Sequence, residues 1–197
     1  MVIKMINYPN GKKYNNNHNN TSASNRGMAL EDDINATNKY YLETDIANIH
    51  KKPTPIQIVH VDYPARNMAK ITEAYFKVPS TTDYNGVYRG KAIDFEAKEC
   101  ASKTAFPLAS IHPHQIKHLE SVLKHGAIAF VIFRFTQYDK TYYISADKVC
   151  SYYETSKRKS IPYAWFEENG IIIEYNLVKP VDYLKIIDKL LEVPNGK

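Results

Sequence analysis

The sequence has little cysteine and no long apolar segment. Its two cysteines, Cys100 and Cys150, lie in neither a CxxC nor a His/Cys metal-ligand spacing, so we expect two free thiols rather than a disulfide framework or a zinc site. The longest apolar run, GAIAFVIF at 126–133, is far too short to cross a bilayer. The first twenty residues contain no apolar stretch long enough for a secretory signal. We therefore expect a cytoplasmic protein that does not associate with membranes.

The composition is that of a globular protein with a modest cationic bias. Of its 197 residues, 44% are hydrophobic and 24% are charged, which suits one domain with a substantial core. The formal net charge of +5 favours a polyanionic partner. Many basic domains bind no nucleic acid, however, so the charge alone does not identify the partner.

The amino-terminal part divides into a polar arm and a helix. Residues 9–25 are Asn-rich with almost nothing to bury, and we predict a flexible arm over 1–25 followed by a single domain over 26–197. Apolar residues at helical spacing predict a helix over 27–43. The acids at its start, including Glu31, suit the positive end of the helix dipole.

The segment over about 51–78 predicts a long hairpin that protrudes from the domain. After the short strand candidate IANIHKK and the sequence Pro53-Thr54-Pro55, two β-prone runs follow, PIQIVHV and AKITEAYFKVP. Between them lies a basic tip that runs from Arg66 to Lys70. Lysines and arginines are expensive to bury, so this segment is poorly explained as core.

The carboxyl-terminal part alternates helices and strands. A helix begins near Pro113 and ends at Gly126, and the apolar run AIAFVIFRF then predicts a buried strand beside TYYISA. IPYAWFEENG predicts a short helix and IIIEY a strand. PVDYLKIIDKLLEV predicts an amphipathic helix that is buried through Leu184, Ile187 and Leu191. The interleaving predicts an α/β fold with a mixed central sheet flanked by helices.

The stretch TTDYNGVYRGKAIDFEAKE, residues 81–99, carries the candidate chemistry. A hairpin that turns at Arg89-Gly90 places Asp83 opposite Glu96 and Thr81 opposite Lys98, so the four share one face. A turn at Asn85-Gly86 fits turn chemistry better in isolation. That register would place Asp83 opposite Tyr88 instead, so the site depends on the register.

Two interpretations of this polar face stay open from the residues alone. Opposed carboxylates repel, and Asp94 on the same face adds a third acid. A divalent cation such as Mg²⁺ would relieve that repulsion, and Lys98 could neutralise charge on a phosphate. The same residues could also be solvated charges on an exposed hairpin, which is the more common role of such a pattern.

The longer context resembles one protein family. The segments RGMALEDDINATNKYYLETDIANIHKKPTPIQIV, VDYPARN, EAYFK, STTDYNGVYRGKAIDFEAKE, KTAFPL and HPHQI closely resemble RecU, the Holliday junction resolvases of Gram-positive bacteria, and Asp83, Glu96 and Lys98 carry its PD-(D/E)xK signature. The resemblance runs from about Tyr8 to Leu123 and continues more loosely toward the carboxyl terminus. It implies a restriction-endonuclease-like core with a stalk, a homodimer, and nicking of four-way DNA junctions that depends on Mg²⁺ or Mn²⁺.

The resemblance also implies roles for particular residues. The metal-site pattern falls on Thr81, Asp83, Glu96 and Gln115, with Lys98 stabilising the transition state and Glu31 near the metals. For Gln115 this role rests on the resemblance alone. Expected phosphate contacts come from Arg66, Lys51, Lys52 and Lys70. Associated protein partners would be RecA and the RuvAB branch-migration machinery. The competing hypotheses are a general duplex endonuclease on the same fold, and a non-catalytic junction-binding or RecA-modulating protein.

Overall fold

The computed structural model describes residues 28–65, 67–77 and 81–192. The arm predicted over 1–25 and the predicted phosphate contact Arg66 lie outside these residues. Within them, no helix combines the length and the apolar character that crossing a membrane requires.

The described residues form a six-stranded mixed sheet in the order β1-β4-β5-β7-β8-β10. Its strands are β1 (Asn48–Lys51), β4 (Tyr84–Tyr88), β5 (Lys91–Cys100), β7 (Ile128–Phe135), β8 (Lys140–Ser145) and β10 (Ile171–Ile173). The central pair β5–β7 is parallel and the other pairs are antiparallel. Parallel neighbours need a crossover connection, and here the chain between them contains a helix that packs on the sheet.

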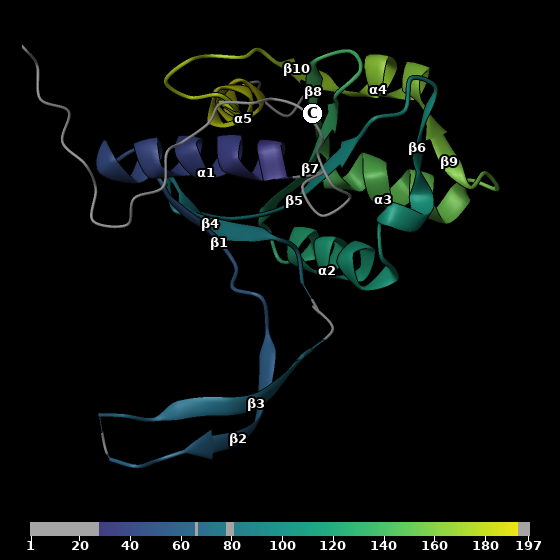
Figure 1. Ribbon diagram of the computed structural model, residues 1–197. Helices are drawn as coiled ribbons and strands as arrows, with labels where there is room; N and C mark the ends of the chain where they lie inside the picture. The colour runs from purple at the N-terminus through teal and green to yellow at the C-terminus, as the bar shows by residue number, and fades with distance from the viewer. Residues whose placement is uncertain (1–27, 66, 78–80, 193–197) are drawn as a thin grey trace, which may run out of the picture.

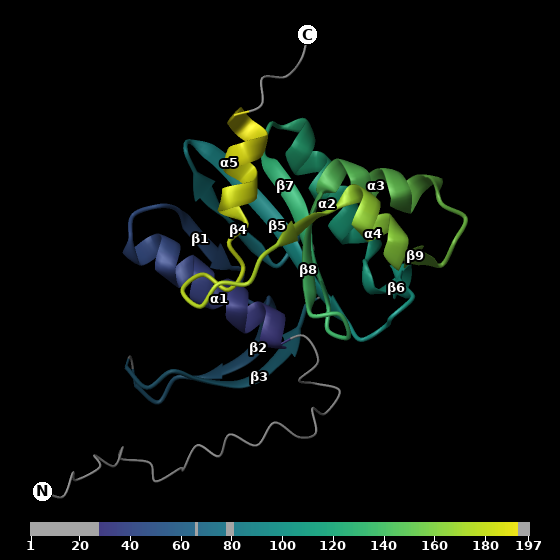
Figure 2. The same cartoon turned by 90° about the horizontal axis from the view of Figure 1, so that it is seen from above.

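Helices cover both faces of this sheet (Figure 1). Helices α1 (Met28–Glu43) and α5 (Leu184–Glu192) share one apolar cluster with the sheet, whereas α2 (Pro113–Lys124), α3 (Ala146–Thr155) and α4 (Tyr163–Asn169) pack in a second cluster on the other face. Figure 2 shows α1 and α5 over the sheet, with α3 and α4 beside β8. The predicted α/β class with a mixed sheet flanked by helices is therefore confirmed.

Three details of the sequence prediction need correction. Helix α3 and the small β6 (Ala105–Pro107)–β9 (Ser160–Pro162) sheet were not predicted, and neither was the 3-10 turn η2 (Leu108–Ser110). The last helix begins only at Leu184, because the segment before it packs in the core as irregular chain. Leu191 is 42% exposed and does not help to bury α5.

The β4–β5 hairpin settles the register on which the candidate site depends. It turns at Arg89 and Gly90, both with positive φ (48° and 72°), as a two-residue turn requires. Tyr84 pairs with Phe95 and Tyr88 with Lys91, which is the register predicted from the Arg89-Gly90 turn. The alternative turn at Asn85-Gly86 is wrong. Gly86 lies inside β4, where a Cβ would come within 2.1 Å of the Asn48 carbonyl oxygen of β1.

A two-stranded stalk leaves the domain between β1 and β4 (Figure 1). Its strands are β2 (Ile56–Asp62) and β3 (Lys70–Phe76), which pair antiparallel from Ile56–Phe76 to Asp62–Lys70. Every residue of β3 is exposed. Among the described elements, β2 and β3 contact each other extensively and the rest of the domain hardly at all. The orientation of the stalk therefore depends on the two chain segments at its base.

Candidate active site

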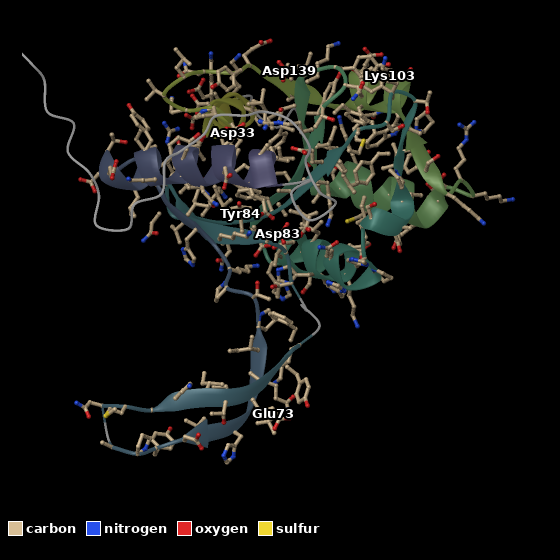
Figure 3. All side chains as sticks on the ribbon, in the orientation of Figure 1. Asp33, Glu73, Asp83, Tyr84, Lys103 and Asp139 are labelled. Carbon is tan, nitrogen blue, oxygen red and sulfur yellow. The ribbon has the colours of Figure 1, made fainter. Side chains whose placement is uncertain are left out.

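The candidate site lies on the face of the sheet that α2 covers, at the end from which the stalk leaves. Asp94, Glu96 and Lys98 share this face because side chains alternate along β5, while Phe95 between them packs in the apolar cluster under α1. Asp83 joins them from the residue before β4, and Figure 3 shows it on the stalk side of the sheet. The predicted face of acids and lysine is thus assembled.

Asp83 and Glu96 are held together by reciprocal hydrogen bonds. The Asp83 backbone N–H donates to Glu96 Oε2 at 3.2 Å. The Ala97 backbone N–H donates to Asp83 Oδ2 at 3.3 Å. Each carboxylate therefore accepts from the backbone of the opposite strand, and the two acids face each other as the predicted register requires.

Glu96 is the most buried acid of the site, with 1% of its surface exposed. Its Oε1 accepts hydrogen bonds from Gln115 Nε2 at 2.5 Å and pairs with Lys98 Nζ at 2.6 Å. Burial, and then repulsion from Asp83, raises the pKa of Glu96 to about 8, although Lys98 acts in the opposite direction. Without a cation, this site thus favours a proton on Glu96.

Gln115 connects the start of α2 to this carboxylate. It is buried, and its Oε1 accepts from the His112 backbone N–H at 2.9 Å while its amide nitrogen faces Glu96. In this arrangement the side chain both caps the helix and orients the acid. No local sequence signal indicates this buried role, because a residue early in a helix is usually solvated.

Glu31 and Thr81 line the same cleft as Asp83. This cleft of about 310 Å³ lies at the base of the stalk, between the first turn of α1 and the segment that returns from the stalk. Glu31 Oε2 forms an ion pair with Lys51 Nζ at 2.5 Å. The structure therefore places Glu31 in the cleft that Asp83 lines, while its expected position near a metal stays a prediction.

Of the three described lysines predicted to contact phosphate, two form ion pairs at the base of the stalk and one lies on its exposed strand. Lys51 is paired with Glu31, and Lys52 is paired with Asp94 at 2.9 Å with only 18% of its side chain exposed. Lys70 lies in the exposed strand β3. Both Lys51 and Lys52 thus already form an ion pair with an acid of the same chain. The sequence pattern indicates Asp94 as a third repelling acid, whereas in the structure Lys52 neutralises it.

The donor set fits a hard divalent cation. The described residues contain no cluster of three or more His, Cys, Asp or Glu side chains arranged around one point, so a cation would rely on Asp83, Glu96 and neutral oxygen donors. Burial, and then repulsion from Asp83, raises the pKa of Glu96, and a cation bound between the two carboxylates would relieve that repulsion in place of the proton. Carboxylate and carbonyl oxygens with several waters are what Mg²⁺ accepts.

Comparison with solved structures gives a weak likeness to Hjc of Archaeoglobus fulgidus, described as a Holliday junction resolvase from an archaeal hyperthermophile. The match covers 75% of this chain and 96% of that one, at 11% identity and a TM-score of 0.44. A TM-score this low does not establish a shared fold.

The comparisons of sequence are much stronger. The proteins called Holliday junction resolvase RecU from Oceanobacillus iheyensis and Geobacillus kaustophilus are 53% and 52% identical to this chain. Each match covers 94% of this chain, and 99% and 97% of the respective relative. The model of the family RecU, described as Recombination protein U, matches residues 25–189. This chain therefore belongs to the RecU family.

Proposed function

We propose that this protein is a Holliday junction resolvase, a metal-dependent endonuclease that nicks four-way DNA junctions in recombination and DNA repair. The observation that carries the proposal is the convergence of Asp83, Glu96 and Lys98 on one buried face at the base of a protruding stalk. The near-complete coverage by relatives named as resolvases supports it. We further propose that the protein works in the cytoplasm.

The residues of the site would divide the work of phosphodiester hydrolysis. Asp83 and Glu96 would hold Mg²⁺, or Mn²⁺ in its place, with Thr81 and Gln115 as neutral neighbours and Glu31 near by. When bound, the cation would supply charge stabilisation at the phosphate and lower the pKa of a water. Lys98, paired with Glu96 at 2.6 Å, would place its ammonium against the negative charge that develops on the phosphate oxygens.

We propose that the protein acts as a homodimer on the junction. Two sites related by a two-fold axis would nick strands of like polarity, as a symmetric junction requires. The stalk supports this proposal, because a two-stranded hairpin with exposed apolar side chains is marginal alone and suits a partner stalk or the open centre of a junction. RecA and the RuvAB machinery are the protein partners we propose on the family resemblance.

Nicking of an end-labelled four-way junction tests the proposal. We expect cleavage with Mg²⁺, none with EDTA, and none by Asp83→Ala, while Asp83→Ala should still bind the junction in EDTA. The exposed acid Glu167 on α4 offers a matched control, and Glu167→Ala should cleave normally. Equal cleavage of linear duplex and junction would indicate a general duplex endonuclease. Junction binding without any cleavage by the wild-type protein would indicate a non-catalytic binder.

A further inference from the structure

Both chain segments at the base of the stalk meet at one buried carboxylate, Asp94. Lys52, the last residue before the Pro53-Thr54-Pro55 segment that leads into the stalk, places its Nζ 2.9 Å from Asp94 Oδ2. Thr82, on the segment that returns, donates its hydroxyl to Asp94 Oδ1. Lys52 Nζ also donates to Thr82 Oγ1 at 2.9 Å, so the two segments are joined to each other as well as to the sheet.

A third element completes this group. His118 of α2 places its Nε2 3.2 Å from Asp94 Oδ1. Asp94 is 7% exposed, and both of its oxygens face partners from the protein. Asp94 is therefore not available as an open ligand, although it lies on the face that carries Glu96.

The same residues are continuous with the candidate active site. Asp94 is two residues from Glu96 on β5, and Thr82 directly precedes Asp83. The Lys52 backbone N–H donates to the Asp83 carbonyl oxygen at 2.7 Å, which ties the outgoing segment to the residue that carries the first acid. Within the described residues, β2 and β3 hardly contact the other helices and strands, so the contacts at this base orient the stalk relative to the site.

We propose that Asp94 is a positioning residue that fixes the direction of the stalk relative to Asp83 and Glu96, and so determines specificity for junctions. The inference rests on the proposed resolvase function. With Asp94 in place, the stalk and the site form one preorganised unit. Without it, the junction must order the stalk base as it binds, which costs affinity for the junction but not for a duplex that does not engage the stalk.

Hydrogen exchange of the DNA-free protein tests the anchoring directly, with no need for cleavage. In Asp94→Asn and in Lys52→Gln we expect faster amide exchange in the peptides that cover 48–56 and 81–88. Asp33→Asn is the matched control, because it removes one carboxylate from another partly buried ion pair, with Arg134 at 2.6 Å, on α1. Unchanged exchange at the stalk base in both Asp94→Asn and Lys52→Gln would overturn the proposal.

Binding in EDTA to a four-way junction and to a linear duplex tests the consequence. We expect Asp94→Asn and Lys52→Gln each to lower the junction-over-duplex affinity ratio by about tenfold, and the double variant to lose no more than either alone, because the two groups act as one unit. Asp33→Asn should keep the wild-type ratio. A single variant that keeps the ratio, or a double variant whose losses add, would overturn the proposal.

Two further outcomes separate this inference from the proposed function. If Asp94→Asn fails to fold, Lys52→Gln carries the same test, because it removes the other partner of the pair. If the wild-type protein shows no preference for junctions, the resolvase proposal fails. Hydrogen exchange then still decides whether Asp94 anchors the stalk.

Discussion

Glu96 is the most buried acid of the candidate site. It combines near-complete burial with a neighbouring acid, a lysine and a buried amide, and its pKa rises to about 8. Strongly perturbed acids with specific charged partners gather at functional sites. Here the perturbation and the partners come from the same few residues that the β4–β5 register brings together.

The raised pKa of Glu96 predicts how stability depends on pH in the cation-free protein. The folded value of about 8 exceeds the ordinary 4.5, so the folded state binds more protons between these values. This stabilisation is complete below pH 4.5 and is lost as pH rises through 8. In EDTA we therefore expect the free energy of unfolding to fall as pH rises from 5 to 8.5. The total fall should exceed that of Glu96→Gln by on the order of a few kcal/mol.

Urea unfolding at a series of pH values checks this prediction. The two proteins differ only at position 96, so the difference between wild type and Glu96→Gln isolates the glutamate. Saturating Mg²⁺ should remove most of the difference in slope, since a cation replaces the proton. Parallel stability curves in EDTA would show that Glu96 is ionised across this range.

Lys98 offers a second prediction at the scale of one side chain. Lys98→Ala should lower the single-turnover nicking rate by about 10²–10³, because one positively charged donor to the transition state is lost. An ammonium cannot ligate a cation, so Mg²⁺ affinity from isothermal titration should persist. Lys159→Ala, an exposed lysine near β9, is the control and should cleave at the wild-type rate. Near-normal cleavage by Lys98→Ala would show that Lys98 does not stabilise the transition state.

At the scale of elements, the stalk differs from the other strands because its apolar side chains are exposed. Ile58, Val59, Tyr75 and Phe76 are all 49–82% exposed, although strands usually hide at least one face. An exposed, apolar, two-stranded element commonly marks an interaction surface. The separate six-stranded sheet is covered on both faces, so the domain does not need the stalk for its core.

Shortening the stalk tests its role. Replacing Val61 to Thr72 with a two-residue turn keeps the ladder from Ile56–Phe76 to His60–Glu73 and joins it directly. We expect a folded protein that still binds Mg²⁺, since Asp83, Glu96 and Lys98 are untouched. It should lose its preference for four-way junctions over linear duplex in gel-shift titrations. A folded variant that keeps the preference would assign selectivity to the globular surface.

For the whole molecule, the net charge of +5 is modest, so binding to DNA depends on where the charges lie. Lys51 and Lys52 are matched by acids within the fold. Among the described lysines discussed for DNA contacts, Lys70 lies on the exposed stalk without an ion pair in the structure. Free basic groups on the stalk would contact phosphate more readily than those at its base.

Salt dependence measures these contacts. Junction affinity should fall steeply with salt, with a log–log slope of about 0.9 per phosphate contact. Lys70→Ala and Arg66→Ala should each flatten that slope by about one unit, whereas Lys159→Ala should leave it unchanged. Filter binding across a salt series gives the slopes. An unchanged slope for either stalk variant would place that residue away from phosphate.

The sequence by itself determined the features that depend on local patterns. Period-two alternation placed Glu96 and Lys98 on one face, as the structure confirms. Of the two turns that the sequence left open, the one at Arg89-Gly90 set Asp83 opposite Glu96, and this is the register that the structure has. Helical spacing and breakers located α1, α2 and α4, and two Pro-flanked β-prone runs located the stalk. These features follow from backbone geometry, which neighbouring residues largely decide.

Only the tertiary structure decided which distant residues meet. Asn85-Gly86 reads locally as a turn, yet it lies within a strand because β1 approaches too closely for any side chain. Gln115 is buried against Glu96, and Lys52 is matched with Asp94, across 19 and 42 positions of the chain. Such contacts depend on how the sheet, α2 and the stalk base pack, and no local period encodes that packing. The sequence could therefore name the acids and the lysine, while the fold decided what surrounds them.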